Sequence, residues 1–197
     1  KFTDLGPQVT ATTIQGSVFA RTDAGADLVY TVARGQPGHL LGYELPSGKP
    51  VLDLPIPKTD GCWNLAVSSD GWLYLPGGEG HLFRVRPGTD RLEDLGVALA
   101  GETIIWDLSA GNDGEIFGGT YPGGRVFRYQ PKEGFSDAGR GSIVAGENYV
   151  RAVAVHRPSE KVFVGVGSHA HLIELDPKTG AKRELLPEKY RAEEAAY

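Results

Sequence analysis

One strand-like pattern recurs along this chain at nearly even intervals, and it limits the folds that the chain can adopt. Each copy alternates apolar and other residues and carries an aromatic side chain near its middle. The copies are 28–34, 72–78, 115–121 and 161–167, with Tyr30, Tyr74, Phe117 and Phe163 as their aromatic residues. These aromatic residues are 44, 43 and 46 positions apart. A period of about 40–50 residues built from strands is typical of a β-propeller blade.

Three further segments accompany each copy, which gives four strands per unit. A segment that precedes each copy is predicted as the innermost strand: 17–25, 62–71, 105–114 and 149–159. A third strand follows each copy after a glycine-rich turn, at 39–46, 81–88, 125–132 and 171–178. The outermost strand comes after a further turn, at 49–55, 91–97, 134–140 and 181–187. The alternation within these segments has the period of two that β-strands require.

We therefore predict an all-β protein that supplies about four blades of a seven- or eight-bladed propeller. The predicted blades are 17–56, 57–98, 99–141 and 142–187, followed by a connector or tail at 188–197. Residues 1–16 are interpreted as the outer strand of the closing blade and its loop, because FTDLG (2–6) parallels LEDLG (92–96). Propellers close to hide their sheet edges. The remaining blades are expected from a missing segment, a cleaved partner chain or a second copy.

Composition narrows the partners that the chain can have. The net charge of −5 and the isoelectric point near 5.5 argue against a nucleic-acid partner. No apolar run reaches the roughly 18 residues of a membrane helix, so no membrane partner is expected. The single cysteine, Cys62, excludes a disulfide framework. Because the chain contains no methionine, we interpret it as a processed product, and we expect an extracellular or periplasmic location.

Equivalent positions in the four units point to a candidate site on one face of the propeller. The residue that opens the predicted third strand is a cation or potential cation in every unit: His39, His81, Arg125 and His171. Such an arc attracts an anionic ligand. The structural alternative is that each side chain caps a turn by bonding to the backbone.

The loops that lead to the innermost strands add aromatic residues and a charge. Trp63, Trp106 and Arg151 occupy equivalent positions, and Tyr149 lies beside Arg151. These tryptophans either pack between blades or form a platform for sugar rings. Tyr121, in the loop 119–124, either reaches toward the axis or covers a blade edge.

His169 and His171 form a His-x-His pair with metal-ligand spacing on a strand. Two ligands do not make a site, so the predicted site contains no metal. A divalent metal, structural or catalytic, stays an open alternative.

The segments ELDPKTGAKREL (174–185) and LSAGNDGEIFGGTYPGGRVFRYQP (108–131) resemble repeats of bacterial secreted propellers of the quinoprotein-like, NHL-like and SMP-30-like types. A narrower resemblance is to propeller-fold polysaccharide lyases, which cleave uronate polymers with histidine, tyrosine and arginine. That resemblance implies five catalytic residues: His81, His171, Tyr121, Tyr149 and Arg151. It implies five substrate-binding residues: His39, Arg125, Trp63, Trp106 and His169.

The leading hypothesis is a secreted propeller that binds an acidic, uronate-containing polysaccharide or oligosaccharide and cleaves it by β-elimination, with no cofactor required. Arginine neutralises the uronate carboxylate, and histidine and tyrosine serve as base and acid. The first alternative is a non-catalytic scaffold that binds protein or glycan. The second is a metal-dependent lactonase or hydrolase of the SMP-30-like type, with Asn64 and Asp107 as ligands.

Overall fold

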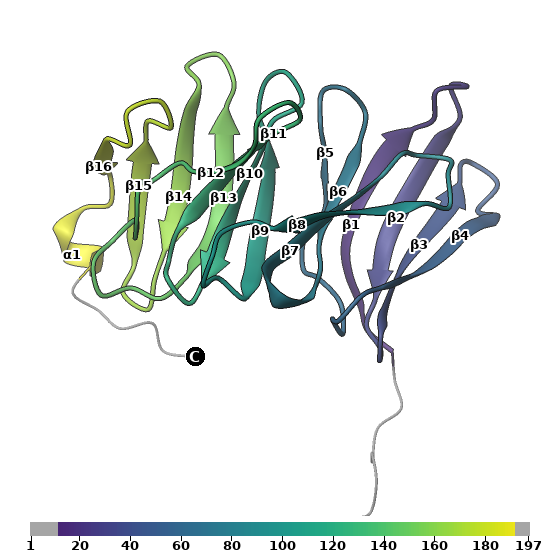
Figure 1. Cartoon of the computed structure of the whole chain (residues 1–197), viewed down its shortest axis with the longest axis horizontal. Coiled ribbons are helices and arrows are strands. Elements are labelled where there is room, and N and C mark those ends of the chain that lie inside the picture. Colours follow the sequence, from purple (N-terminus) through teal and green to yellow (C-terminus); the bar gives the residue numbers. More distant parts are fainter. Residues whose placement is uncertain (1–11, 192–197) are drawn as a thin grey trace, which may run out of the picture.

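The computed structural model describes residues 12–191, and within them four antiparallel sheets of four strands stand side by side (Figure 1). Blade 1 consists of β1 (Ile14–Arg21), β2 (Asp27–Ala33), β3 (Gly38–Glu44) and β4 (Pro50–Ile56). Blade 2 consists of β5 (Ala66–Val67), β6 (Leu73–Pro76), β7 (His81–Val85) and β8 (Leu92–Val97). Blade 3 consists of β9 (Ile104–Ala110), β10 (Ile116–Tyr121), β11 (Val126–Gln130) and β12 (Gly134–Asp137). Blade 4 consists of β13 (Val150–His156), β14 (Lys161–Val166), β15 (His171–Leu175) and β16 (Lys182–Glu184).

In every blade the strands pair in chain order, which confirms the predicted four-stranded propeller blades. The first strands of successive blades contact one another, so β1, β5, β9 and β13 line the inside of the arc. Beyond the sheets, the described residues form a short 3₁₀ segment at Gly78–Gly80 and one helical turn, α1 (Glu188–Arg191). No helix in residues 12–191 is long and apolar enough to cross a membrane.

Several strand ends differ from the sequence expectation. β1 already begins at Ile14, inside the range assigned to a closing strand and its loop, and residues 1–11 of that range lie outside the described residues. β5 contains only Ala66 and Val67. The side-chain oxygen of Asn64 accepts a hydrogen bond from the backbone N–H of Leu65. Asp107, the equivalent residue of blade 3, accepts the Leu108 N–H in the same way within the seven-residue β9, so this bond does not account for the short β5.

The core lies between the blades rather than within each sheet. Tyr30 fills the interface between blades 1 and 2, Tyr74 that between blades 2 and 3, and Phe117 that between blades 3 and 4. The equivalent aromatic residue in blade 4, Phe163, is only half-buried, because the described residues supply no following blade. The repeated aromatic residue is therefore the side chain that joins each blade to the next.

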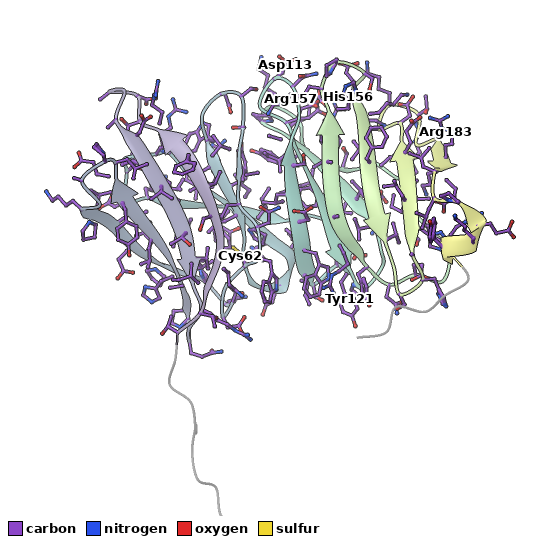
Figure 2. All side chains as sticks on the ribbon, turned by 180° about the vertical axis from the view of Figure 1, so that it is seen from behind. Cys62, Asp113, Tyr121, His156, Arg157 and Arg183 are labelled. Atoms are coloured by element: carbon purple, nitrogen blue, oxygen red, sulfur yellow. The ribbon has the colours of Figure 1, made fainter. Side chains whose placement is uncertain are left out.

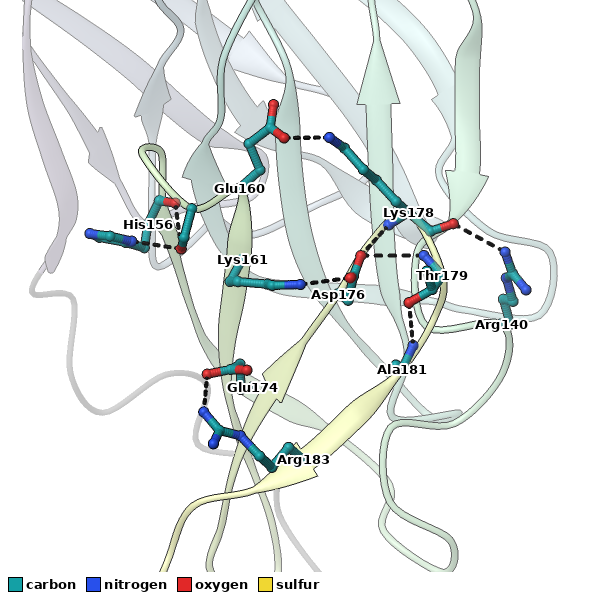
Figure 3. Close-up of polar contacts among 11 residues, drawn as sticks. Arg140, His156, Glu160, Lys161, Glu174, Asp176, Lys178, Thr179, Ala181 and Arg183 are labelled. Atoms are coloured by element: carbon teal, nitrogen blue, oxygen red, sulfur yellow. Dashed lines mark hydrogen bonds and ion pairs between the residues drawn. The ribbon is translucent and has the colours of Figure 1, made fainter.

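Polar pairs join the turn between β13 and β14 to the turn between β15 and β16 in blade 4 (Figure 3). Lys161 Nζ lies 2.6 Å from the Asp176 carboxylate, and Lys178 pairs with Glu160. The backbone N–H of Lys178 also donates to Asp176. These bonds hold the pKa of Asp176 at about 2, with the Lys161 hydrogen bond as the largest cause.

Candidate functional site

The candidate site lies on the face formed by two kinds of loop, which we call the site face. One kind joins the outermost strand of a blade to the innermost strand of the next, and the other joins the second and third strands. Tyr121 marks this face at the lower edge of Figure 2, and Asp113 and Arg157 lie at the opposite, upper edge. Loops from all four blades reach this face, so residues far apart in the sequence meet there.

Three aromatic residues and one arginine form a cluster on this face, which we call the aromatic–arginine cluster. The Tyr149 ring lies 6.4 Å from the Trp106 ring and 6.2 Å from the Tyr121 ring, measured between centroids. The Arg151 guanidinium lies 4.5 Å from the Trp106 ring centroid and 5.4 Å from that of Tyr149. Because β9 and β13 are neighbours on the inside of the arc, equivalent positions in blades 3 and 4 come together. The structure thus joins four of the residues that the sequence singled out separately.

Arg151 is the unpaired cation of this cluster. Its side chain is exposed, and no carboxylate in residues 12–191 pairs with it. The guanidinium contacts the faces of the Trp106 and Tyr149 rings. A guanidinium that stacks in this way keeps its N–H edge available for a planar anion such as a carboxylate.

A groove of about 850 Å³ runs beside the cluster between loops of blades 1, 2 and 3. Trp63 and Trp106 both line it, and the Trp63 side chain is exposed, at 60% of its accessible surface. The charged lining residues are already paired: Arg34 lies 2.5 Å from Asp60, and Lys58 lies 2.5 Å from Glu79. The groove therefore offers flat apolar surfaces, while Arg151 supplies the unpaired charge next to Trp106.

The four cations of the third strands belong neither to the aromatic–arginine cluster nor to the lining of the groove. Each is bonded to a carboxylate of the outermost strand in its own blade. The nitrogen–oxygen distances are 2.5 Å for His39–Asp53, 2.9 Å for His81–Asp94, 2.5 Å for Arg125–Asp137 and 2.7 Å for His171–Glu184. His81 and His171 open β7 and β15, whereas His39 is the second residue of β3 and Arg125 precedes β11.

This pairing changes what the four cations can do. Partial burial opposes ionisation of Asp94 and Glu184, but bonds from their histidines and from backbone N–H groups outweigh it and keep both pKa values below the usual range. Each cation is thus matched by a carboxylate, so the four add no unbalanced positive charge to the site face. They act as cross-strand ties between the third and outermost strands, a role that is distinct from a backbone turn cap.

The residues considered as metal ligands are occupied by other bonds. Asn64 donates to Asp107, whose second oxygen accepts the Val153 N–H at 2.6 Å. His169 Nδ1 lies 2.7 Å from Glu147, whereas His171 is bonded to Glu184, so the two histidines have separate partners. Within residues 12–191 no three His, Cys, Asp or Glu side chains are grouped so that they could hold a metal ion.

Two buried carboxylates of the site face were missed by sequence reasoning. Glu102 and Glu147 each follow an Ala-Gly pair, at 100–102 and 145–147, and each precedes its innermost strand by a short loop. The repeated Ala-Gly-Glu triplet was the available signal. Cys62 is buried, and burial raises the pKa of its thiol to about 12, which is the state of an inert packed residue.

Comparison with known proteins supports the fold. No family model matches the chain, and no curated protein is similar to it in sequence. Streptogramin B lyase shares 14% identity with a TM-score of 0.59, over 90% of this chain and 56% of that one. A catalytically inactive variant of virginiamycin B lyase from Staphylococcus aureus with quinupristin shares 10% identity with a TM-score of 0.58, over 90% of this chain and 75% of that one.

A structural-genomics protein of unknown function from Bacteroides thetaiotaomicron shares 12% identity with a TM-score of 0.57, over 84% of this chain and 46% of that one. The chain thus spans about half the length of streptogramin B lyase. At these identities the likeness concerns the fold alone. The chain has the β-propeller fold, which it shares with streptogramin B lyase and virginiamycin B lyase.

Proposed function

We propose that this protein binds an acidic, ring-containing ligand of the uronate-glycan class on its site face. The observation that carries the proposal is the unpaired Arg151 guanidinium stacked 4.5 Å from the Trp106 ring centroid. A uronate residue presents a carboxylate beside a ring with an apolar face. Arginine binds carboxylates through two parallel N–H bonds, and tryptophan offers a rigid surface on which such a ring packs.

The groove extends this recognition beyond one ring. Trp63 and Trp106 line the same 850 Å³ groove, so a second sugar ring has an apolar surface next to the first. The paired charges of Arg34 and Asp60 and of Lys58 and Glu79 border the groove, where they can exchange hydrogen bonds with hydroxyl groups. An oligosaccharide therefore suits the groove better than a small inorganic anion.

The proposal includes β-elimination at the bound uronate. In this reaction a proton leaves the carbon next to the carboxylate, and negative charge develops toward the carboxylate oxygens. Arg151 bound to that carboxylate stabilises the charge. Tyr121 and Tyr149, whose rings lie 6.2 Å apart in the same cluster, provide phenolic groups that can donate a proton to the leaving oxygen. The same proposal places the protein outside the cytoplasm, in the extracellular space or the periplasm, where uronate polymers occur.

The non-catalytic scaffold is the second candidate, because the side chains of His81 and His171 join neighbouring strands and are only 24% and 18% exposed to a ligand. Binding without cleavage fits that arrangement. The SMP-30-like alternative loses support, because Asn64 and Asp107 are bonded to each other and to the backbone.

The test combines binding with ultraviolet absorbance, since elimination leaves a conjugated unsaturated uronate. Wild type is incubated with a panel of uronate polysaccharides. It is also incubated with quinupristin, because the inactive virginiamycin B lyase among the structural neighbours is bound to that compound. Arg151→Gln should lose about 10- to 100-fold in affinity, which corresponds to a charged hydrogen bond of about 1.5–3 kcal/mol. Arg183→Gln is the matched control. Arg183 is an exposed arginine on β16, the outermost strand of blade 4, and it pairs with Glu174 on β15.

A rise in absorbance with one polymer supports the lyase, and binding without a rise supports the scaffold. Equal affinities of Arg151→Gln and Arg183→Gln for every ligand in the panel would show that Arg151 is not the anion clamp.

A further inference from the structure

A buried carboxylate holds an imidazole at the rim of the site face. Glu147 is only 8% exposed, and it lies in the loop before β13. His169 Nδ1 lies 2.7 Å from Glu147 Oε1, which also accepts the backbone N–H of His169 at 3.4 Å. Burial opposes ionisation of Glu147, but these bonds outweigh it and keep the pKa of Glu147 below its usual value. The loop therefore holds a fixed negative charge against one edge of the imidazole.

Blade 3 shows what this carboxylate does when no imidazole is present. Glu102, the equivalent residue, is 5% exposed and accepts the backbone N–H of Gly123 at 2.9 Å. Gly123 occupies in blade 3 the position that His169 occupies in blade 4, two residues before the cation of the third strand. Glu102 also pairs with Arg125, whose Nη1 lies 4.0 Å from Glu102 Oε1. In blade 4 the side-chain partner of the carboxylate is His169, an addition that Gly123 cannot supply in blade 3.

The addition lies next to the aromatic–arginine cluster. The backbone N–H of Gly167, two residues before His169, donates to the Tyr149 carbonyl at 3.2 Å. On the other side, the Glu147 carbonyl approaches Gly124 closely, in the loop that carries Tyr121. The loops of His169, Tyr149 and Tyr121 are therefore neighbours on one rim.

The free edge of the imidazole faces outward. The His169 side chain is 49% exposed, and its Nε2 has no hydrogen-bond partner in the described part of the chain. A carboxylate on Nδ1 fixes the tautomer that carries its proton there, so Nε2 is the lone-pair nitrogen of the neutral ring. This is the arrangement in which an imidazole accepts a proton from a ligand while the carboxylate stabilises the resulting cation.

We infer that Glu147 and His169 form a carboxylate–imidazole dyad in which His169 is the proton acceptor of the site and Glu147 is its positioning residue. This inference rests on the proposed elimination function. It assigns the base to His169 because that side chain is 49% exposed, whereas His81 and His171, bonded to carboxylates through Nδ1 in the same way, are only 24% and 18% exposed. His169 Nε2 takes the proton from the carbon next to the carboxylate. The C–H electron pair forms the carbon–carbon double bond, the bond to the leaving oxygen breaks, and that oxygen takes a proton from a tyrosine phenol.

The first test measures the histidine itself, so it does not depend on turnover. Two-dimensional NMR of the imidazole nitrogens, which reports the tautomer, compares wild type with Glu147→Gln and Glu102→Gln. In wild type His169 should carry its proton on Nδ1, and this tautomer should lose population in Glu147→Gln because a neutral amide is a weaker acceptor than a carboxylate. Glu102→Gln removes the equivalent carboxylate of blade 3 and should leave the His169 tautomer unchanged. An unchanged His169 tautomer in a folded Glu147→Gln protein would overturn the dyad.

The second test measures the elimination rate on the polymer that wild type cleaves. His169→Gln should lower the rate by about 100-fold or more while affinity stays within about twofold. Glu147→Gln should lower it less, because the imidazole remains and only its positioning is weakened. His156→Gln is the control, because His156 is an exposed histidine bonded to Ser159 at the opposite edge of blade 4 (Figure 2).

The outcomes separate the two proposals. Absence of elimination by wild type on every polymer overturns the proposed catalysis, and the role of His169 as its base falls with it. Elimination by wild type that His169→Gln retains overturns the dyad alone. Where Glu147→Gln does not fold, His169→Gln and His169→Asn give the same decision.

Discussion

Asp107 should be among the most sensitive polar positions of the propeller, because it ties three blades together. It lies on β9 of blade 3 and accepts a side-chain bond from Asn64 of blade 2. Its second oxygen accepts the Val153 N–H of blade 4 at 2.6 Å, and its first accepts the Leu108 N–H at 2.9 Å. We therefore predict a large loss of stability for Asp107→Ala.

The size of the loss follows from the two backbone donors. Val153 is 7% exposed and Leu108 is 4% exposed, so water does not readily replace the lost carboxylate. A buried donor left without a partner costs about 1–3 kcal/mol, which gives a loss of about 2–6 kcal/mol for the two. Asp107→Asn keeps one acceptor oxygen but turns an NH₂ group toward a second donor, so we expect roughly half that loss. Asn64→Ala leaves both backbone bonds to Asp107 intact but removes the acceptor of the buried Leu65 N–H, so it should cost about 1–3 kcal/mol.

Urea unfolding followed by tryptophan fluorescence measures these differences, with the denaturant slope checked for constancy. A loss of 4 kcal/mol corresponds to a fall in Tm of roughly 8–16 °C for a chain of this size. Asp107→Ala is expected to lose most, with Asp107→Asn and Asn64→Ala each losing roughly half as much. Were Asp107→Ala within about 1 kcal/mol of wild type, or were a chelator to destabilise wild type by the same amount, the interpretation of Asp107 as a tie between blades would be refuted.

Three further predictions follow from burial and charge. Cys62 should not react with a thiol reagent at pH 8 until the protein unfolds, because burial raises its pKa to about 12; rapid labelling of folded protein would contradict this. Phe127 is fully buried between blades 2 and 3, so Phe127→Ala should lower the free energy of unfolding by about 3–5 kcal/mol, as measured by urea unfolding. Because the pKa of Asp176 is lowered from 3.8 to about 2, its stabilising contribution is complete above 3.8 and is lost as the pH falls toward 2. Asp176→Asn should therefore flatten the acid limb of the stability profile over that range, and an unchanged limb would count against the Lys161 bond as its cause.

The blades could be predicted because their signal is local. Tyr30, Tyr74 and Phe117 recur at a fixed period within alternating segments, and these segments form the second strands of their blades. Pairing in chain order needs only short turns, so the sequence order is also the order within each sheet. The length of β5 was not predictable in this way, because segment 62–71 was assigned to an innermost strand like those of the other blades, yet only Ala66 and Val67 form one.

The site was predicted less completely, because its contacts join different strands and blades. His39, His81, Arg125 and His171 were recognised as a series, but their carboxylates lie 12 to 14 residues further on, in the outermost strands. That regular spacing was present in the sequence and went unused. Trp106 and Arg151 were matched as equivalent positions, yet their stacking depends on the packing of β9 against β13. Glu147 carried no signal beyond the Ala-Gly-Glu triplet.

The packing between blades has a consequence for local unfolding. Within residues 12–191, blades 2 and 3 are covered on both faces, whereas blades 1 and 4 are covered on one. Neighbour-to-neighbour packing makes stability a sum of blade and interface contributions. Backbone amides of β9 and β13 should thus exchange with solvent when the interface between blades 3 and 4 opens. Because Trp106 and Arg151 come from blades 3 and 4, a ligand bound by both, as proposed above, would link these two blades and slow that exchange. Ligand binding and the folding of blade 4 are then one coupled equilibrium.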